Sequence, residues 1–233
     1  LDAAFGRLMD EVERLKLSDN LFTLFTSDNG PARTGFHPHG ETGSLRDKKG
    51  WLSEGGIRVP GILRWPGKTR PGSTSEVPIS GVDLLPTLCE ITSIETPSDR
   101  AIDGISFLPL LADKPMQRQT PLYWHYYAAS GKPKVAMRMG DWKILAHLDA
   151  PEISKRVDLT ARDQKTLKTA KLGKFELYNL GKDPSESNDL ASSEANRLEK
   201  MSKRLQSMYE DVQKECPVWP EWEWARYEHE RIQ

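Results

Sequence analysis

Hydrophobic residues follow helical spacing at the start of the chain and then gather in one continuous run. Residues 2–16 place apolar side chains on one helical face, at Ala4, Phe5, Leu8, Val12 and Leu15. The stretch LFTLFTS, residues 21–27, is too apolar to alternate, which is typical of a strand buried in a parallel sheet. A helix followed by a buried strand predicts half of an α/β crossover unit.

The middle of the chain alternates loops with short elements. Residues 30–56 are rich in glycine and charge and predict a long loop, a kind that is usually functional or disordered. Residues 57–67 predict a second apolar strand, and 77–93 predict a helix capped near Ser80 or Asp83. A short helical element is expected within 103–113.

After residue 118 the pattern changes to short strands. Apolar segments at 121–128, 134–140, 142–148 and 174–180 predict four strands, and MRMGDWKIL predicts a hairpin between two of them. Residues 154–173 predict a polar surface insertion. The last helix is expected to carry an apolar stripe, made by Leu198, Met201, Leu205, Met208 and Val212.

Composition narrows the possible functions. The 233 residues carry a formal net charge of −1, so no long-range field points to nucleic acid or to a membrane surface. The chain lacks an apolar run long enough to span a bilayer. Two cysteines exclude a disulfide framework; Cys89 is expected in a core and Cys216 near an exposed helix end.

The expected strand at 21–27 ends on Asp28, Asn29 and Gly30. One interpretation is a turn that stops the strand. The other is a pair of oxygen donors for a hard metal ion, placed where α/β sheets hold their ligands. The local sequence leaves both interpretations open.

The Asp28–Gly30 step is part of a series of five motifs that occur in order along the chain: SDNGP (27–31), KGWLSEGGIRVP (49–60), GVDLLPTL (81–88), DGISFLPLL (103–111) and ELYNLGKDPSESNDLA (176–191). In this order they resemble the sulfatase family, the arylsulfatase-like branch of the alkaline-phosphatase superfamily. The resemblance covers the C-terminal half to two-thirds of a typical sulfatase.

The resemblance implies an α/β fold in two parts. Residues 1–118 are expected to form part of an alkaline-phosphatase-like mixed sheet flanked by helices. Residues 119–233 are expected to form a C-terminal α+β subdomain with a small antiparallel sheet, a long helix and a Trp-rich tail that holds Trp219, Trp222 and Trp224.

It also implies site residues. Asp28 and Asn29 are expected to ligate one Ca²⁺, and Asp28 to help deprotonate the nucleophile. Lys49, five residues before Glu54, is expected to contact a sulfate oxygen, although Lys48 is adjacent. His37 and His39 are candidates for substrate contact, with a plain surface-loop role left open.

The family nucleophile is a formylglycine, made from Cys or Ser in a C/S-x-P/A-x-R context. Neither Cys89 nor Cys216 has that context, and the chain begins inside a helix without Met. We therefore expect a fragment that is inactive and poorly soluble alone, whose partners are a sulfated small molecule or glycan and the missing N-terminal half. A periplasmic, secreted or lysosomal location is implied by the family.

Two other functions stay open at this point. One is a phosphoester or phosphonate hydrolase of the same superfamily, which would use a Ser or Thr and two metals. The other is a non-catalytic relative that binds sulfated glycans.

Overall fold

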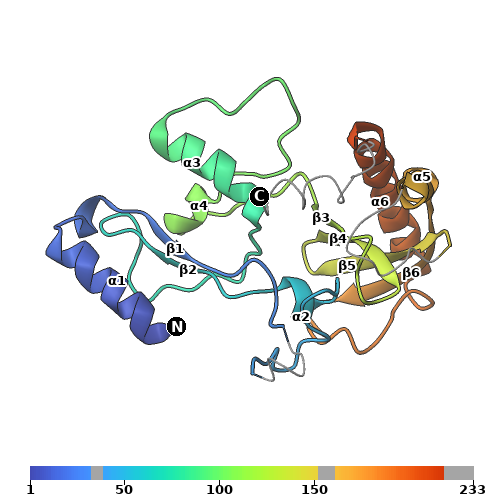
Figure 1. Ribbon diagram of the computed structural model, residues 1–233, viewed down its shortest axis with the longest axis horizontal. Helices are drawn as coiled ribbons and strands as arrows, with labels where there is room; N and C mark the ends of the chain where they lie inside the picture. The colour runs from blue at the N-terminus through green and yellow to red at the C-terminus, as the bar shows by residue number, and fades with distance from the viewer. Residues whose placement is uncertain (33–38, 152–160, 218–233) are drawn as a thin grey trace, which may run out of the picture. The chain divides into compact units, whose positions relative to one another are not determined.

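The computed structural model describes residues 1–32, 39–151 and 161–217 (Figure 1). His37 and the three tail tryptophans lie outside these residues. Contacts divide the chain into two compact units, and each is described separately. Unit 1 comprises residues 1–28 and 59–122, and unit 2 comprises residues 29–58 and 123–233.

Unit 1 contains most of the short helices. Helix α1 spans Asp2–Arg14, the 3-10 turn η1 spans Ser18–Asn20, and strands β1 and β2 span Thr23–Phe25 and Ile62–Arg64. The 3-10 turn η2 spans Gly81–Asp83, α3 spans Leu84–Thr92 and α4 spans Leu108–Leu111. The helices expected near the N-terminus, at 77–93 and within 103–113 are confirmed.

Among the described residues, the first strand pairs with an antiparallel partner and not with the expected parallel one. β1 pairs antiparallel with β2, with Leu24 opposite Leu63, and each of its residues is half-buried. The expectation rested on a helix followed by an apolar run, a pattern that does not identify the neighbouring strand. Here the pairing strand lies beyond a long loop and returns in the opposite direction.

Asp83 organises the second half of unit 1. It is fully buried and closes a capping box, since its Oδ2 accepts from the backbone N–H of Ser80 at 2.7 Å. Its Oδ1 accepts from the N–H of Ile105 at 2.9 Å, and Arg118 pairs with it. This confirms the cap expected at Ser80 or Asp83 and ties the GVD and DGIS motifs together.

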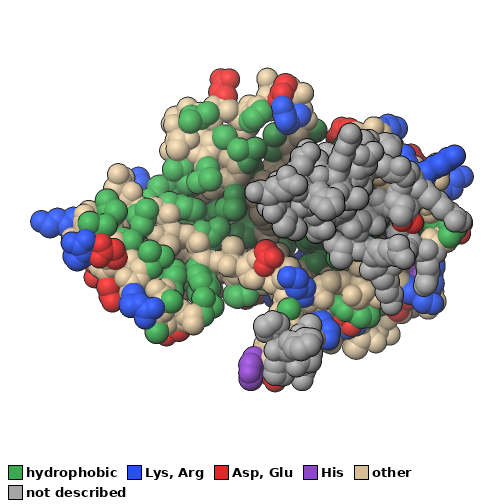
Figure 2. All heavy atoms as spheres, in the orientation of Figure 1, with side chains coloured by type: hydrophobic (Ala, Val, Ile, Leu, Met, Phe, Trp, Pro, Cys, Tyr) green, Lys and Arg blue, Asp and Glu red, His purple; other side chains and the backbone are tan. Residues whose placement is uncertain are grey.

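Unit 1 leaves many large apolar side chains exposed. Hydrophobic side chains spread over the face seen at the left of Figure 2. Those above a third exposed come from α1, β2 and the α3 region, and include Leu8, Leu15, Ile62, Leu85, Leu88 and Ile94. Cys89 on α3 is half-buried and Cys216 is exposed.

Unit 2 is built on a four-stranded sheet. Its order is β3 (Leu122–His125), β4 (Pro133–Met139), β5 (Trp142–Asp149) and β6 (Lys171–Asn179). β4, β5 and β6 pair antiparallel, so the four expected strands and the hairpin are confirmed. Helices α2 (Glu54–Ile57), α5 (Ala161–Thr169) and α6 (Ala195–Glu215) complete the unit.

The alternation of β4 and β5 gives this sheet two apolar faces. One face packs against α6: Val135, Met137, Ile144 and Leu177 meet Met201, Leu205 and Tyr209. The other face carries Ala136, Leu145, Tyr178 and Leu180, and Leu52 of the 46–56 loop packs there. The core therefore fixes the loop that carries the lysine motif.

Candidate functional site

Two of the sequence motifs lie side by side in unit 2. The backbone N–H of Gly30 donates to the carbonyl of Gly56 at 2.9 Å, and the N–H of Lys49 donates to the carbonyl of Pro31 at 3.1 Å. Main-chain hydrogen bonds are insensitive to side-chain identity and give a fixed separation. The Asn29–Pro31 segment is therefore held beside the Lys49–Gly56 segment.

The close approach requires glycine at position 30. Gly30 is buried, and a Cβ built on it would lie 1.9 Å from the carbonyl oxygen of Gly55. Gly55 and Gly56 are equally restricted, because a Cβ on either would lie within 2.4 Å of a carbonyl oxygen of the same loop. The glycines in the two motifs thus permit contact between backbones.

The 46–56 loop is tightly wound. Asp47 and Gly50 have φ angles of 63° and 89°, and the N–H of Gly55 donates to the carbonyl of Arg46 at 2.8 Å. The hydroxyl of Ser53 donates to the Asp47 carboxylate, which supports the unusual backbone at Asp47. Helix α2 forms at the end of this loop, inside a region that the sequence predicts as irregular.

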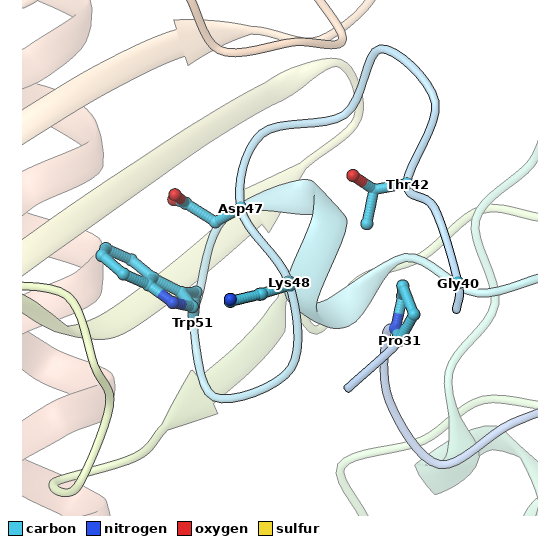
Figure 3. A pocket seen from close by; sticks show the side chains of 6 residues that line it. All are labelled: Pro31, Gly40, Thr42, Asp47, Lys48 and Trp51. Carbon is cyan, nitrogen blue, oxygen red and sulfur yellow. The ribbon is translucent and has the colours of Figure 1, made fainter. Parts of the chain in front are cut away.

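A hollow of about 310 Å³ opens along the loop (Figure 3). Its lining side chains and backbone come from Pro31, Gly40, Thr42, Asp47, Lys48 and Trp51. Figure 3 shows Lys48 and Trp51 extending to the same side of the loop. Lys48 is the lysine that lines this hollow, and Lys49 is not among its lining residues.

Arg46 fixes the start of the loop on β6. Its guanidinium donates to the hydroxyl of Tyr178 at 2.9 Å and lies 3.7 Å from the Glu176 carboxylate. Burial acts to raise the pKa of Glu176, but hydrogen bonds from His147 and Tyr178 and the charge of Arg46 outweigh it. The pKa of Glu176 is therefore held below its usual value, so this carboxyl stays ionised.

The structure describes four of the five predicted site residues, and His37 lies outside the described ranges. Asp28 is exposed and its Oδ1 lies 3.4 Å from the hydroxyl of Ser27; Asn29 is half-buried and its Nδ2 donates to the carbonyl of Gly30 at 3.0 Å. Lys49 and His39 are exposed. Asp28 ends the first segment of unit 1, while Asn29 and Lys49 belong to unit 2, in segments that the backbone bonds described above connect.

The donor types at positions 28 and 29 suit a hard cation, because carboxylate and amide oxygens are what Ca²⁺ prefers. Ca²⁺ takes about six to eight oxygen ligands, and these two residues supply two side chains. Across the described ranges, His, Cys, Asp and Glu side chains form no group of three that could hold a metal. The pair therefore fits part of a calcium shell.

Sequence reasoning missed Lys143 and Glu186, whose charged ends are buried behind the loop. Lys143 lies in WKIL, where alternation would put it on a strand face, and Glu186 lies in a turn motif. A lysine inside an apolar strand was the available signal.

Within the described part of the chain, none of the helices combines the length and apolar character needed to cross a bilayer.

Comparison with known proteins identifies the family. Residues 40–171 match the model for the C-terminal region of N-sulphoglucosamine sulphohydrolase. The chain belongs to the sulfatase family. The expected resemblance and the alkaline-phosphatase-like fold are both confirmed.

Individual sulfatases support this membership. Human arylsulfatase A is 34% identical over 89% of the chain, and rat steryl-sulfatase is 37% identical over 54% of it. A solved protein in complex with its substrate D-glucosamine-2-N,6-O-disulfate matches 91% of the chain at 26% identity with a TM-score of 0.61. The chain spans 41%, 23% and 38% of these three proteins, respectively.

Proposed function

We propose that this chain is the C-terminal part of a sulfatase that removes sulfate from a sulfated carbohydrate or an aryl ester. The observation that carries the proposal is the pair of backbone hydrogen bonds that holds Asn29–Pro31 beside Lys49 and Gly56. These bonds support the proposal because they join the segment of a candidate metal ligand, Asn29, to the segment of a candidate sulfate-binding lysine, Lys49.

Asp28 and Asn29 are proposed as two ligands of one Ca²⁺, with the other ligands outside this chain. A bound divalent cation supplies stabilisation of negative charge on the sulfate oxygens. Asp28 is also proposed to help deprotonate the nucleophile. The half-buried Asn29 amide is oriented by its own turn.

Lys49 is proposed to neutralise a sulfate oxygen. Its side chain is exposed, and its backbone N–H is hydrogen-bonded to the carbonyl of Pro31. The ammonium can therefore reach a ligand while the main chain stays in place. An ammonium is a compact charge that suits a tetrahedral anion. His39 and His37 are proposed to contact the substrate.

The nucleophile of the proposed reaction is a formylglycine made from a Cys or Ser outside this chain. The chain by itself is therefore proposed to be inactive. The sequence identity with a protein that acts on a sulfated glucosamine favours a sulfated glycan as the substrate class. Handling of such substrates agrees with a periplasmic, secreted or lysosomal location.

The proposal is tested on the full-length protein that contains this chain. We expect it to release sulfate from p-nitrophenyl sulfate or glucosamine 6-sulfate in the presence of Ca²⁺, with little release of phosphate from p-nitrophenyl phosphate. Asp28→Ala should weaken Ca²⁺ binding by at least tenfold in calorimetry and lower turnover at least 100-fold. The control is Asp211→Ala, which changes an exposed carboxylate on α6.

Three results would contradict parts of this proposal. Faster phosphate than sulfate release would favour a phosphoester hydrolase. Binding of sulfated glucosamine without turnover would favour a non-catalytic relative. Unchanged Ca²⁺ affinity in Asp28→Ala would remove Asp28 from the metal site.

A further inference from the structure

Lys143 on β5 carries its charge into the interior of unit 2. Its side chain is fully buried, and its Nζ lies 2.8 Å from Glu54 Oε1 and 2.9 Å from Glu186 Oε1. Both carboxylates are also buried, with side chains at most 2% exposed. Removing three charges from water is costly, and such groups often contribute less to stability than apolar residues of the same size. Their presence therefore points to a role in specifying geometry.

The two carboxylates connect the sheet to the lysine loop. The backbone N–H of Glu54 donates to Glu186 Oε2 at 2.7 Å, and Arg46 Nη1 donates to the Glu186 carbonyl at 3.0 Å. Arg46 and Glu54, both in the 46–56 loop, are thus attached to the same residue, Glu186. Lys143 then joins that residue and Glu54 to the middle of the sheet.

The attachment continues from the loop to the metal motif. Gly56 accepts from Gly30, and Lys49 donates to Pro31, so a shift of the loop moves the residues that follow Asn29. The path from Lys143 runs through one ion pair, a four-residue helix and these backbone bonds. It contains no long flexible side chain between Glu54 and Gly30.

Two arginines also face the Glu54 carboxylate of this group. Arg138 lies 3.6 Å from Glu54 Oε2 and Arg58 lies 3.9 Å from it, with Arg58 the more exposed of the two. Loss of the Lys143 ammonium would leave Glu54 and Glu186 facing each other across a buried space. Because like charges repel strongly there, the loop end at Glu54 is the part expected to move.

We propose that Lys143, together with Glu54 and Glu186, is a positioning residue that sets the place of the Lys49 loop and of the Asn29–Pro31 segment attached to it. The group acts through these residues and contacts no reacting atom. Its effect on turnover rests on the proposed sulfatase function, while its effect on the loop does not.

The test compares two variants of the full-length protein with one control. Lys143→Met keeps the length of the side chain and removes its charge. Lys143→Met/Glu186→Gln also removes one carboxylate, so it avoids the repulsion and keeps an oxygen for the N–H of Glu54. The control is Lys203→Met, which changes an exposed lysine on α6.

Hydrogen exchange gives the direct measurement. Both Lys143 variants lack the ion pairs that join Glu54 and Glu186 to β5. We therefore expect amides in peptides covering 46–58 to exchange at least tenfold faster in each of them, with protection in α6 retained in the double variant. Lys203→Met should match the wild type. Unchanged exchange at 46–58, or a uniform rise over β4, β5 and α6 in the double variant, would overturn the proposal.

Turnover provides the second measurement. On a sulfate ester, the double variant should lose 10- to 100-fold in kcat with a smaller change in KM, because misplacement of the lysine affects the reacting geometry. Wild-type protein that hydrolyses no sulfate ester would count against the proposed function, whereas the exchange result would still decide the positioning role. Wild-type kcat in the double variant would count against the positioning role.

Discussion

Replacing Gly30 with alanine tests the contact between the two motifs most sharply. The added Cβ would lie 1.9 Å from the Gly55 carbonyl oxygen and 2.9 Å from its carbon. A carbon–oxygen contact needs about 3.3 Å, so the two backbones must separate by roughly 1.4 Å. The hydrogen bond from Gly30 to Gly56 cannot survive that shift.

The cost can be estimated from these contacts. Overpacking of a tight site costs about 1–3 kcal/mol, and a buried hydrogen bond left unmade costs about 1–3 kcal/mol more. The lower entropy of the unfolded alanine chain offsets about 0.4–1 kcal/mol. We therefore expect Gly30→Ala to lower the free energy of unfolding by about 2–4 kcal/mol.

Urea unfolding of the full-length protein, followed by circular dichroism, measures this change. The control is Gly173→Ala on β6, where the nearest atom to the added Cβ is the Asp149 Cβ at an ordinary 3.4 Å. The control should remain within about 0.5 kcal/mol of the wild type. A Gly30→Ala protein as stable as the control would refute the close approach of the two segments.

Three further predictions concern unit 2. Leu205→Ala on α6 removes a fully buried side chain from the sheet face and should cost about 2–5 kcal/mol in urea unfolding; a loss below 1 kcal/mol would contradict the packing described. Asp183→Ala removes the acceptor of four hydrogen bonds in the DPSES turn and should cost about 1–3 kcal/mol, against less than 0.5 kcal/mol for the exposed Asp211→Ala. Burial lowers the pKa of His125, so the folded state favours the neutral ring and stability should fall as the pH drops below about 6.5. In His125→Gln, the melting temperature should therefore change less between pH 7 and 5 than in the wild type. An equal change in both proteins would show that His125 is not the cause.

The sheet and long helix of unit 2 follow from local pattern. Met137 and Ile144 alternate with polar or oppositely facing neighbours, and the Gly140–Asp141 step provides the turn, with φ of 57° at Gly140. The stripe through Met201 and Leu205 then identifies the face of α6 that meets them. Period and turn chemistry are properties of neighbouring residues, so sequence alone suffices to predict them.

Other features depend on residues distant in sequence. Antiparallel pairing of Leu24 with Leu63 could not be predicted, because the apolar run at 21–27 does not specify its partner. The Lys143 group joins positions 54, 143 and 186, and no local motif connects them. The roles of Asn29 and Lys49 were expected from family resemblance, whereas the backbone bonds and the glycine contact that join their segments come from the fold.

The most direct test of the account compares Lys49→Ala with Lys48→Ala in the full-length protein. The two lysines are adjacent in sequence and carry the same side chain. Lys49 is exposed and its backbone N–H is bonded to Pro31, while Lys48 is half-buried and lines the hollow. Initial rates of sulfate release from p-nitrophenyl sulfate at saturating Ca²⁺ give kcat/KM for each. We expect kcat/KM to fall about 10²–10³-fold in Lys49→Ala, the loss that follows when one group that stabilises developing negative charge is removed, and less than tenfold in Lys48→Ala. Equal, small losses in both variants would contradict a role for Lys49 in sulfate ester cleavage.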